Sequence, residues 1–505
     1  MGTDESPEVV TASGRVRGTR EGELAVFRGI PFAAPPVGPN RFAAPQPAAR
    51  WDGVRDAVAL GPGVPQELLE PVAPSANAAD DEWLTVNVWT PAPDPRASRP
   101  VMVWIYGGAY KYGSSNQPSY DGRVLAAEGE VVVVTFNYRV GMEGFAAIEG
   151  APANRGLLDQ VAALAWVREN IAAFGGDPEQ VTVFGESAGA GSVAALLAMP
   201  AARGLFRRAI AQSVAGTYFS GELAADIGRE LAAGLGLRAT VQDLARLEPG
   251  TLATAGALLT PRMREYAERW GAVAHTGTPF SPVVDGEVLP RSPWRALADG
   301  AAREVELIVG HTRDEYRLFL GMAGRLGQIT DEQASEMLRA MGPGSDPEGA
   351  YRAALPDASA ELLYERVQSD WLFRMPSLRL AEAHVGAGGR AHVYELTYAA
   401  PANGGLLGAC HGMDVALVFG VFEGLGATLF GPDPSPETQA ISAWWRRAWT
   451  NFATTGDPGW PVYDAAQRST CVIDVEPTTT AYPEEISRQL WEQESFDTLP
   501  LVGAA

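Results

Sequence analysis

The 505-residue chain has 46% hydrophobic and 20% charged residues, a composition that excludes a largely disordered protein and supplies a large apolar core. Its formal net charge of -22 repels polyanions, so we expect no nucleic-acid partner. Two cysteines, Cys410 and Cys471, are too few for a disulfide framework or a multi-cysteine metal site.

The sequence gives no sign of a membrane segment. No stretch approaches the ~20 apolar residues that a membrane-spanning helix needs, so we expect no membrane partner. The first residues include Asp4 and Glu5, where a secretion signal carries basic residues, and no apolar run follows them. Because few cysteines also suit a reducing compartment, we expect a cytoplasmic protein.

The first half of the chain alternates apolar runs with helical patterns. Four short runs rich in β-branched and aromatic residues predict strands buried on both faces: 101–106, 131–137, 181–184 and 306–309. Helical spacing predicts helices over 157–174 and 188–199, and a further short strand is predicted over 209–212. Since parallel strands need crossover connections, this alternation predicts an α/β fold with a mainly parallel sheet.

Two later segments, 222–268 and 332–382, have helical composition and no strong strand signal. We expect them to be helical insertions between strands, of the kind that usually shapes a pocket. Large α/β enzymes with such insertions often remain one unit, so we expect one domain over residues 1–505. Residues 61–80 are rich in Pro, Ala and Gly, which predicts a long loop.

The run Gly185-Glu186-Ser187-Ala188-Gly189 lies between the predicted strand that ends at Phe184 and the helix that begins near Ala188. This is the context of a nucleophile elbow, a sharp turn that exposes a serine hydroxyl at the end of a strand. Gly185 and Gly189 are needed because a Cβ at either position would collide with the neighbouring strand or helix. The run therefore predicts Ser187 as a nucleophile.

A serine nucleophile needs a basic side chain, which is itself oriented by an acid. The chain order nucleophile, acid, base leaves His384, His392 and His411 as candidate bases. His384 lies in an Ala-rich helical stretch and His392 in the strand-like run 391–396, which favours structural roles for both. His411 is favoured because it lies in a glycine-flanked loop, from which a side chain can reach a pocket.

Two neighbouring residues, Asp314 and Glu315, are candidate acids. They follow the predicted strand 306–309, at the edge of the sheet where such folds place catalytic groups, and either can serve. Gly107-Gly108-Ala109 follows strand 101–106, where small residues let backbone N–H groups approach a substrate carbonyl oxygen. The N–H of Ala188 at the elbow is a further donor.

Several short runs of this chain occur in one combination, namely 27–33, 41–45, 84–91, 154–160, 174–178, 184–189, 280–286 and 445–458. In this combination the chain resembles the type B carboxylesterase family, which includes cholinesterases and bacterial para-nitrobenzyl esterases. The resemblance covers most of the chain. It implies an α/β-hydrolase fold, with a large, mostly parallel twisted sheet, helices on both faces and helical insertions around an active-site gorge.

The resemblance also assigns roles to residues. The family's acid is the Glu of a Gly-x-x-x-Asp-Glu run and its base the His of a Gly-Ala-x-His run, which implies a triad of Ser187, Glu315 and His411. The implied oxyanion-hole donors are Gly108, Ala109 and Ala188. The implied polar groups near the triad are Glu186, Ser213 and Asp414. No metal or organic cofactor is implied.

The expected activity is hydrolysis of small-molecule carboxylic esters through an acyl-enzyme on Ser187. The same triad can attack any activated acyl carbon, so amides, carbamates and lactones stay open as substrates, as does the choice between a monomer and a homodimer. A binding or adhesion module that has lost catalysis is disfavoured because all three triad positions are present. Thr276 and Thr278 precede Phe280, where cholinesterases narrow the acyl pocket with Phe, which predicts room for acyl groups larger than acetyl.

Overall fold

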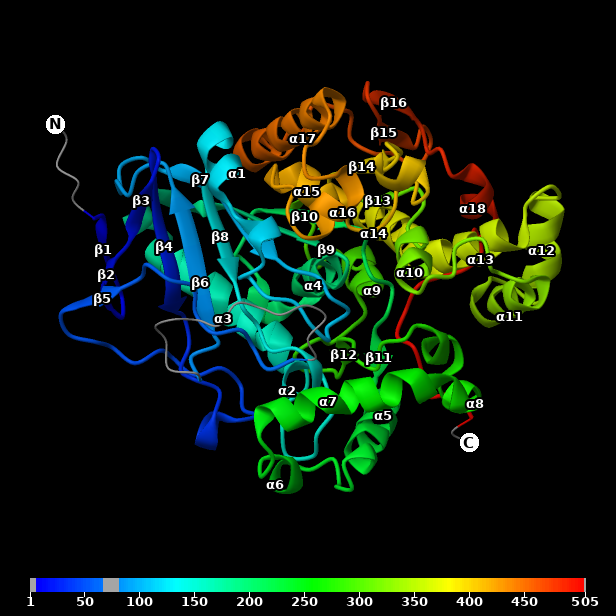
Figure 1. Cartoon of the computed structure of the whole chain (residues 1–505), viewed down its shortest axis with the longest axis horizontal. Coiled ribbons are helices and arrows are strands. Elements are labelled where there is room, and N and C mark those ends of the chain that lie inside the picture. The colour runs from blue at the N-terminus through cyan, green and yellow to red at the C-terminus, as the bar shows by residue number, and fades with distance from the viewer. Residues whose placement is uncertain (1–5, 67–80, 504–505) are drawn as a thin grey trace.

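The computed structural model describes residues 6–66 and 81–503. Within this part of the chain, a twisted eleven-stranded sheet runs across the molecule in the order β16-β15-β14-β13-β10-β9-β7-β8-β6-β4-β3 (Figure 1). Its strands are β3 (Thr19–Glu21), β4 (Leu24–Pro31), β6 (Thr85–Thr90), β7 (Arg99–Ile105), β8 (Val132–Phe136), β9 (Gly176–Glu186), β10 (Arg208–Gln212), β13 (Glu306–Thr312), β14 (Ala391–Leu396), β15 (Ser469–Ile473) and β16 (Thr478–Ala481).

The centre of this sheet is parallel and its edges are antiparallel. Strands β8, β7, β9, β10, β13, β14 and β15 pair in parallel, whereas β16 joins β15, and β6, β4 and β3 join the other edge, in antiparallel register. Every residue of β8 and β10 is buried, as predicted for strands covered on both faces. The predicted α/β fold with a mainly parallel sheet is therefore confirmed. The antiparallel strands at its edges were not predicted.

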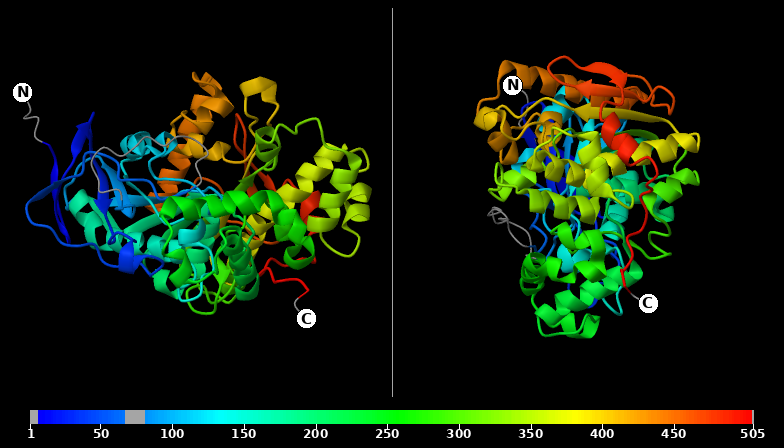
Figure 2. Two further views of the ribbon diagram at one scale, coloured as in Figure 1. Left: turned by 60° about the horizontal axis from the view of Figure 1, so that its bottom comes forward. Right: turned by 90° about the vertical axis from the view of Figure 1, so that its right-hand side faces the viewer.

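Helices cover both faces of the sheet (Figures 1 and 2). On one face α3 (Arg155–Asn170) and α4 (Ala188–Ala198) contact β9, α14 (Met375–Gly386) contacts β13 and β14, and α9 (Pro293–Ala298) packs on α4 and α14. On the other face α1 (Arg123–Gly129) contacts β6 and β8, α17 (Pro436–Thr455) contacts β7 and β9, and α15 (Met413–Phe419) packs on both helices. The predicted helices over 157–174 and 188–199 are confirmed.

One boundary differs from the prediction. The glycine-rich run 175–178, expected to close a helix before a strand over 181–184, already belongs to β9, which begins at Gly176. Gly176 pairs with Arg99, and the register shifts before Val101 pairs with Val181. Pro178 is tolerated there because this irregularity interrupts the hydrogen-bond ladder, to which proline cannot donate.

The segments 222–268 and 332–382 are occupied mainly by helices. The first holds most of α5 (Gly221–Gly234), α6 (Val241–Leu244), α7 (Pro249–Leu259) and the start of α8 (Ala267–Trp270). The second holds α11 (Asp331–Met341), α12 (Pro347–Ala354) and α13 (Ala360–Ser369), then a π turn at Asp370–Arg374 that leads into α14. Of the loop predicted over 61–80, residues 67–80 lie outside the described residues.

The remaining elements are short. They are β1 (Glu8–Thr11), β2 (Gly14–Arg17) and β5 (Val54–Asp56) in one small sheet, β11 (Phe219–Ser220) and β12 (Val283–Val284) in another, and the helices α2 (Gly141–Gly144), α10 (Arg317–Met322), α16 (Leu425–Phe430) and α18 (Glu485–Leu490). Among the described helices, none is both long and apolar enough to cross a membrane.

Candidate active site

Ser187 lies in the sharp turn between β9 and α4, as the sequence predicts. Its backbone has φ 59° and ψ -123°, a conformation that few residues with a side chain adopt. A Cβ on Gly189 would lie 2.0 Å from the carbonyl oxygen of Ile105, and one on Gly185 would lie 2.7 Å from the same oxygen, so both positions require glycine. Ser187 is half-buried between buried neighbours. The turn therefore presents the serine at the end of the strand.

The segment after β7 lies directly against this serine. A Cβ on Gly107 would lie 3.1 Å from the Cβ of Ser187. The N–H groups of Gly108 and Ala109 donate no hydrogen bond to another described residue. Ala188 is the first residue of α4, a position whose N–H has no acceptor within the helix. These N–H groups can therefore donate to a ligand oxygen beside Ser187.

A buried acid–base pair joins the turn after β13 to the loop before α15. His411 Nδ1 lies 2.6 Å from Glu315 Oε2, and the backbone N–H of His411 donates to the carbonyl oxygen of Glu315. The second carboxylate oxygen of Glu315 accepts from Ser213 Oγ at 2.6 Å and from the Thr312 N–H at 2.9 Å. Glu315 is fully buried, and these donors fix its carboxylate against the imidazole.

Asp314, the alternative acid, contacts different groups. Its Oδ2 accepts a hydrogen bond from the Ala409 N–H at 2.8 Å, and its own N–H donates to the Ala409 carbonyl oxygen. Asp314 thus ties the turn that carries Glu315 to the loop that carries His411, while Glu315 contacts the imidazole itself.

The other imidazole nitrogen faces Glu186, the residue before Ser187. His411 Nε2 lies 3.1 Å from Glu186 Oε1 and forms no hydrogen bond with any described residue, Ser187 included. The rings of Phe373 and Phe319 pack next to the imidazole, with centroids 4.2 Å and 5.2 Å away. The structure therefore brings His411 to the elbow and leaves its Nε2 available to a proton donor.

Charge and burial adjust the pKa values of these groups. Burial alone raises the pKa of Glu315, but His411 and the hydrogen bonds of Ser213 and Thr312 outweigh it, so the net pKa is lowered. Burial lowers the pKa of His411, but the carboxylates of Glu186 and Glu315 dominate and raise it above its usual value. Burial raises the pKa of Glu186. The acid is thus ionised, and the imidazole is a stronger base than usual.

The other candidates lie away from this pair. His384 Nε2 contacts the carbonyl oxygen of Val305 and His392 Nδ1 that of Trp460, each at 2.9 Å. Asp414, in the first turn of α15, accepts from Tyr394 at 3.0 Å. Of the three predicted polar groups near the triad, Ser213 thus donates to the acid and Glu186 lies beside the base. Asp414 lies three residues after His411, in the first turn of α15. Among the described residues, no group of three or more His, Cys, Asp or Glu side chains is placed to hold a metal ion.

Sequence reasoning missed three contacts at the site. Phe319 and Phe373 pack next to the base, but they lie in helical segments whose apolar pattern is the same as that of core residues. Thr278 Oγ1 donates to the Ala109 carbonyl oxygen at 2.9 Å and so anchors the segment after β7. The one signal for Thr278 was its expected position ahead of Phe280.

Comparisons with known proteins identify the family of this chain. The sequence profile of the carboxylesterase family matches residues 5–491. The para-nitrobenzyl esterase of Bacillus subtilis is 38% identical over 499 residues, 95% of this chain and 97% of that protein. The phenmedipham hydrolase of Pseudarthrobacter oxydans is 33% identical over 487 residues, 93% of this chain and 95% of that protein. The solved structure of the Geobacillus stearothermophilus carboxylesterase EST55 is 36% identical, has a TM-score of 0.83 and covers 96% of this chain and 99% of its own. The chain therefore belongs to the carboxylesterase family and is a carboxylic ester hydrolase with the α/β-hydrolase fold.

Proposed function

We propose that this hydrolase works through an acyl-enzyme on Ser187, with His411 as the base and Glu315 as the acid that orients it. The observation that carries the proposal is the buried 2.6 Å contact between His411 and Glu315, placed beside a serine in a strained strand-to-helix turn. Nucleophile, acid and base also follow one another along the chain in the order typical of this fold.

In the proposed reaction, Ser187 Oγ attacks the ester carbonyl carbon while His411 Nε2 takes the hydroxyl proton. Glu315 accepts the hydrogen bond of Nδ1–H and stabilises the imidazolium that forms. The N–H groups of Gly108, Ala109 and Ala188 bind the oxyanion. The imidazolium then gives its proton to the leaving alcohol, and water repeats the cycle on the acyl-enzyme. Because catalytic hydrogen bonds often form fully only with substrate bound, the unpaired Nε2 is compatible with this role.

We infer that the substrates are small-molecule esters with acyl groups larger than acetyl. Thr278 is bonded to the Ala109 carbonyl oxygen, which supports its position on the acyl side of the site. A threonine there takes less space than the phenylalanine expected in cholinesterases. Amides, carbamates and lactones contain the same type of acyl carbon, so a panel of leaving groups is needed to rank them.

We also propose that the chain is one domain and acts in the cytoplasm. The central sheet draws strands from both ends of the described chain, from β3 to β16, which supports a single folding unit. Cys410 and Cys471 are free and buried, as suits a reducing compartment. Cell fractionation and the number of thermal unfolding transitions test these two statements.

The triad is tested by Ser187→Ala. We expect kcat to fall by ~10⁶ with the fold retained, as for the removal of a catalytic serine in comparable triads. Ser192→Ala is the matched control, because Ser192 lies in α4, the helix that follows Ser187, and its Oγ accepts a hydrogen bond from Gln160 at 3.0 Å. A Ser187→Ala protein that keeps its esterase activity contradicts the proposal.

A further inference from the structure

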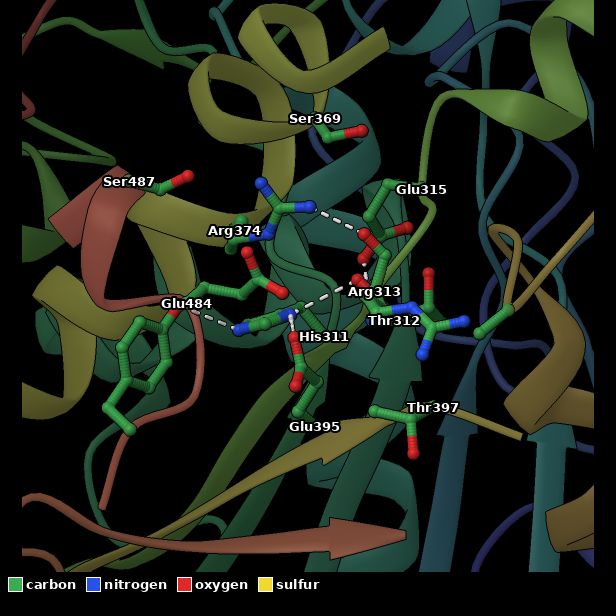
Figure 3. Close-up of polar contacts among 12 residues, drawn as sticks. His311, Thr312, Arg313, Glu315, Ser369, Arg374, Glu395, Thr397, Glu484 and Ser487 are labelled. Carbon is green, nitrogen blue, oxygen red and sulfur yellow. Dashed lines mark hydrogen bonds and ion pairs between the residues drawn. The ribbon is translucent and has the colours of Figure 1, made fainter. Parts of the chain in front are cut away.

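A buried polar cluster lies behind the turn that carries Glu315, and Figure 3 shows Arg374 at its centre. Arg374 is 1% exposed. It is the last residue of the π turn Asp370–Arg374, which joins α13 to α14. Single π turns inside helices are rare and occur frequently at functional sites, so the contacts of this one bear on the reaction.

The guanidinium of Arg374 joins two elements. Its Nη1 forms an ion pair with Asp370, in the same π turn, and its Nη2 donates to the carbonyl oxygen of Arg313. Arg313 lies two residues before Glu315. Because the planar guanidinium offers several donors in a fixed geometry, one side chain can hold both acceptors at once.

The same helical segment holds the turn on the other side of Glu315. The N–H of Tyr316, the next residue, donates to Ser369 Oγ at 3.0 Å and to Glu365 Oε1 at 3.3 Å. The Ser369 hydroxyl in turn donates to Glu365. The backbone is therefore held two residues before the acid and at the residue after it, by residues that lie within 365–374.

The π turn also contacts the base. Phe373, the residue before Arg374, packs on the His411 ring with the two centroids 4.2 Å apart. One short segment thus contacts the backbone that carries the acid and the ring of the base. A displacement of the π turn changes both positions together.

Charged and titratable groups surround Arg374 from five parts of the chain. They are Asp370 in the π turn, Glu365 in α13, His311 in β13, Glu395 in β14, and Tyr482 and Glu484 before α18. Burial lowers the pKa of Arg374, but Asp370, Glu484 and Glu365 outweigh it and raise that pKa, so the guanidinium stays charged. Burial lowers the pKa of His311 to about 4, so this imidazole is neutral near pH 7, and burial raises the pKa of Glu395.

We propose that Arg374 is a positioning residue for the Glu315–His411 pair, acting through the Arg313 carbonyl and through Phe373 without touching the substrate. The inference rests on the proposed function, because it requires Glu315 and His411 to act as acid and base. If the turn loosens, Glu315 moves away from His411 Nδ1. The imidazole is then correctly oriented in a smaller fraction of molecules.

Arg374→Lys distinguishes the positioning role of the guanidinium from the effect of its positive charge. Lysine keeps the positive charge beside Asp370, but its single ammonium does not reproduce the two-pronged contact of a guanidinium. Arg208→Lys is the matched control, since Arg208 is also buried and bonds one carboxylate, Glu306 at 2.7 Å, and one carbonyl oxygen, that of Ala453 at 2.9 Å. Arg208 is the first residue of β10 and pairs with Thr182, whereas Ser187 follows the carboxyl end of the neighbouring strand β9.

We expect kcat of Arg374→Lys to fall about 10- to 100-fold with KM changed by less than about threefold, because small misplacements of catalytic groups act on the chemical step. The low-pH limb of kcat/KM should also move to lower pH, because a weaker contact with Glu315 lowers the pKa of His411. Arg208→Lys should lose similar thermal stability and keep both kcat and the limb. A purely structural role for Arg374 predicts that the two variants behave alike.

Ser369→Ala gives an independent reading if Arg374→Lys does not fold. It removes one acceptor of the Tyr316 N–H and the hydrogen bond from Ser369 to Glu365, whose Oε1 still accepts from the Tyr316 N–H. We expect a smaller fall in kcat, with the limb displaced in the same direction. The proposal is overturned if Arg374→Lys folds and has the kcat and the low-pH limb of kcat/KM of the wild type. If Arg374→Lys does not fold, an unchanged low-pH limb in Ser369→Ala overturns it. Full activity of Ser187→Ala would instead overturn the proposed function.

Discussion

Glu186→Gln tests the electrostatics of the site with one atom changed. The glutamine keeps the volume of the side chain and removes its charge. Glu186 Oε1 lies 3.1 Å from His411 Nε2 in the wild-type structure, where it stabilises the imidazolium. The base works only when neutral, so activity is lost as the pH falls through the pKa of His411. Removing the carboxylate lowers that pKa and should extend activity to lower pH.

The geometry sets the size of this shift. Two unit charges at the observed 3.1 Å interact by roughly 5 kcal/mol at an effective dielectric constant of about 20, which corresponds to about four pKa units as an upper limit. Burial raises the pKa of Glu186, which opposes its ionisation, and Glu315 continues to favour the imidazolium after the substitution. We therefore expect the low-pH limb to move down by about one to three units.

The assay is kcat/KM for a chromogenic ester, measured from acidic to mildly alkaline pH. Glu143→Gln is the matched control, because Glu143 is also a buried glutamate but lies in α2, where it pairs with Arg41 at 2.8 Å. Its limb should stay at the wild-type pH. A Glu186→Gln limb that stays in place or moves to higher pH refutes the reasoning.

Two further predictions concern the acid and the acyl side. Ser213→Ala removes a hydroxyl that donates to the buried carboxylate of Glu315 at 2.6 Å, so we expect about 1.5–3 kcal/mol lower stability in urea unfolding together with a lower kcat; unchanged values of both would argue against this contact. Among esters of one alcohol, those with acyl chains longer than acetate, up to hexanoate, should have a kcat/KM at least as high as that of the acetate ester. A steady fall in kcat/KM with chain length would contradict a roomy acyl side.

The nucleophile and the central sheet could be predicted because their signals are local. A strand fully buried on both faces is a continuous apolar run, as in β8. The elbow needs glycine on either side of Ser187, and Gly189 lies too close to Ile105 for any Cβ. Both patterns can be recognised within about ten residues.

The edges of the sheet could not be predicted, because their structure depends on distant partners. All four residues of β16 are exposed, and they form a strand because they pair with β15. Without the family resemblance, which implies Glu315, the choice between Asp314 and Glu315 is similarly open, since adjacent acids share one sequence context. Only the fold places one beside His411 and the other beside Ala409.

Arg374 shows the same limit most clearly. In the sequence it is an arginine in a helical segment, a position that usually faces solvent. In the structure it is buried where the π turn, β13, β14 and the residues before α18 converge. No local pattern reports that convergence, so neither its burial nor its bond to Arg313 could be predicted.

The central claim is that Ser187 carries the acyl group. Mass spectrometry of the enzyme inactivated with an organophosphate tests it most directly, with Ser187→Ala treated in parallel. The account predicts one adduct per chain, on the peptide that contains Ser187, formed as activity is lost and absent from the variant. Inactivation with the adduct on another residue, or an equal adduct on the Ser187→Ala protein, would contradict it.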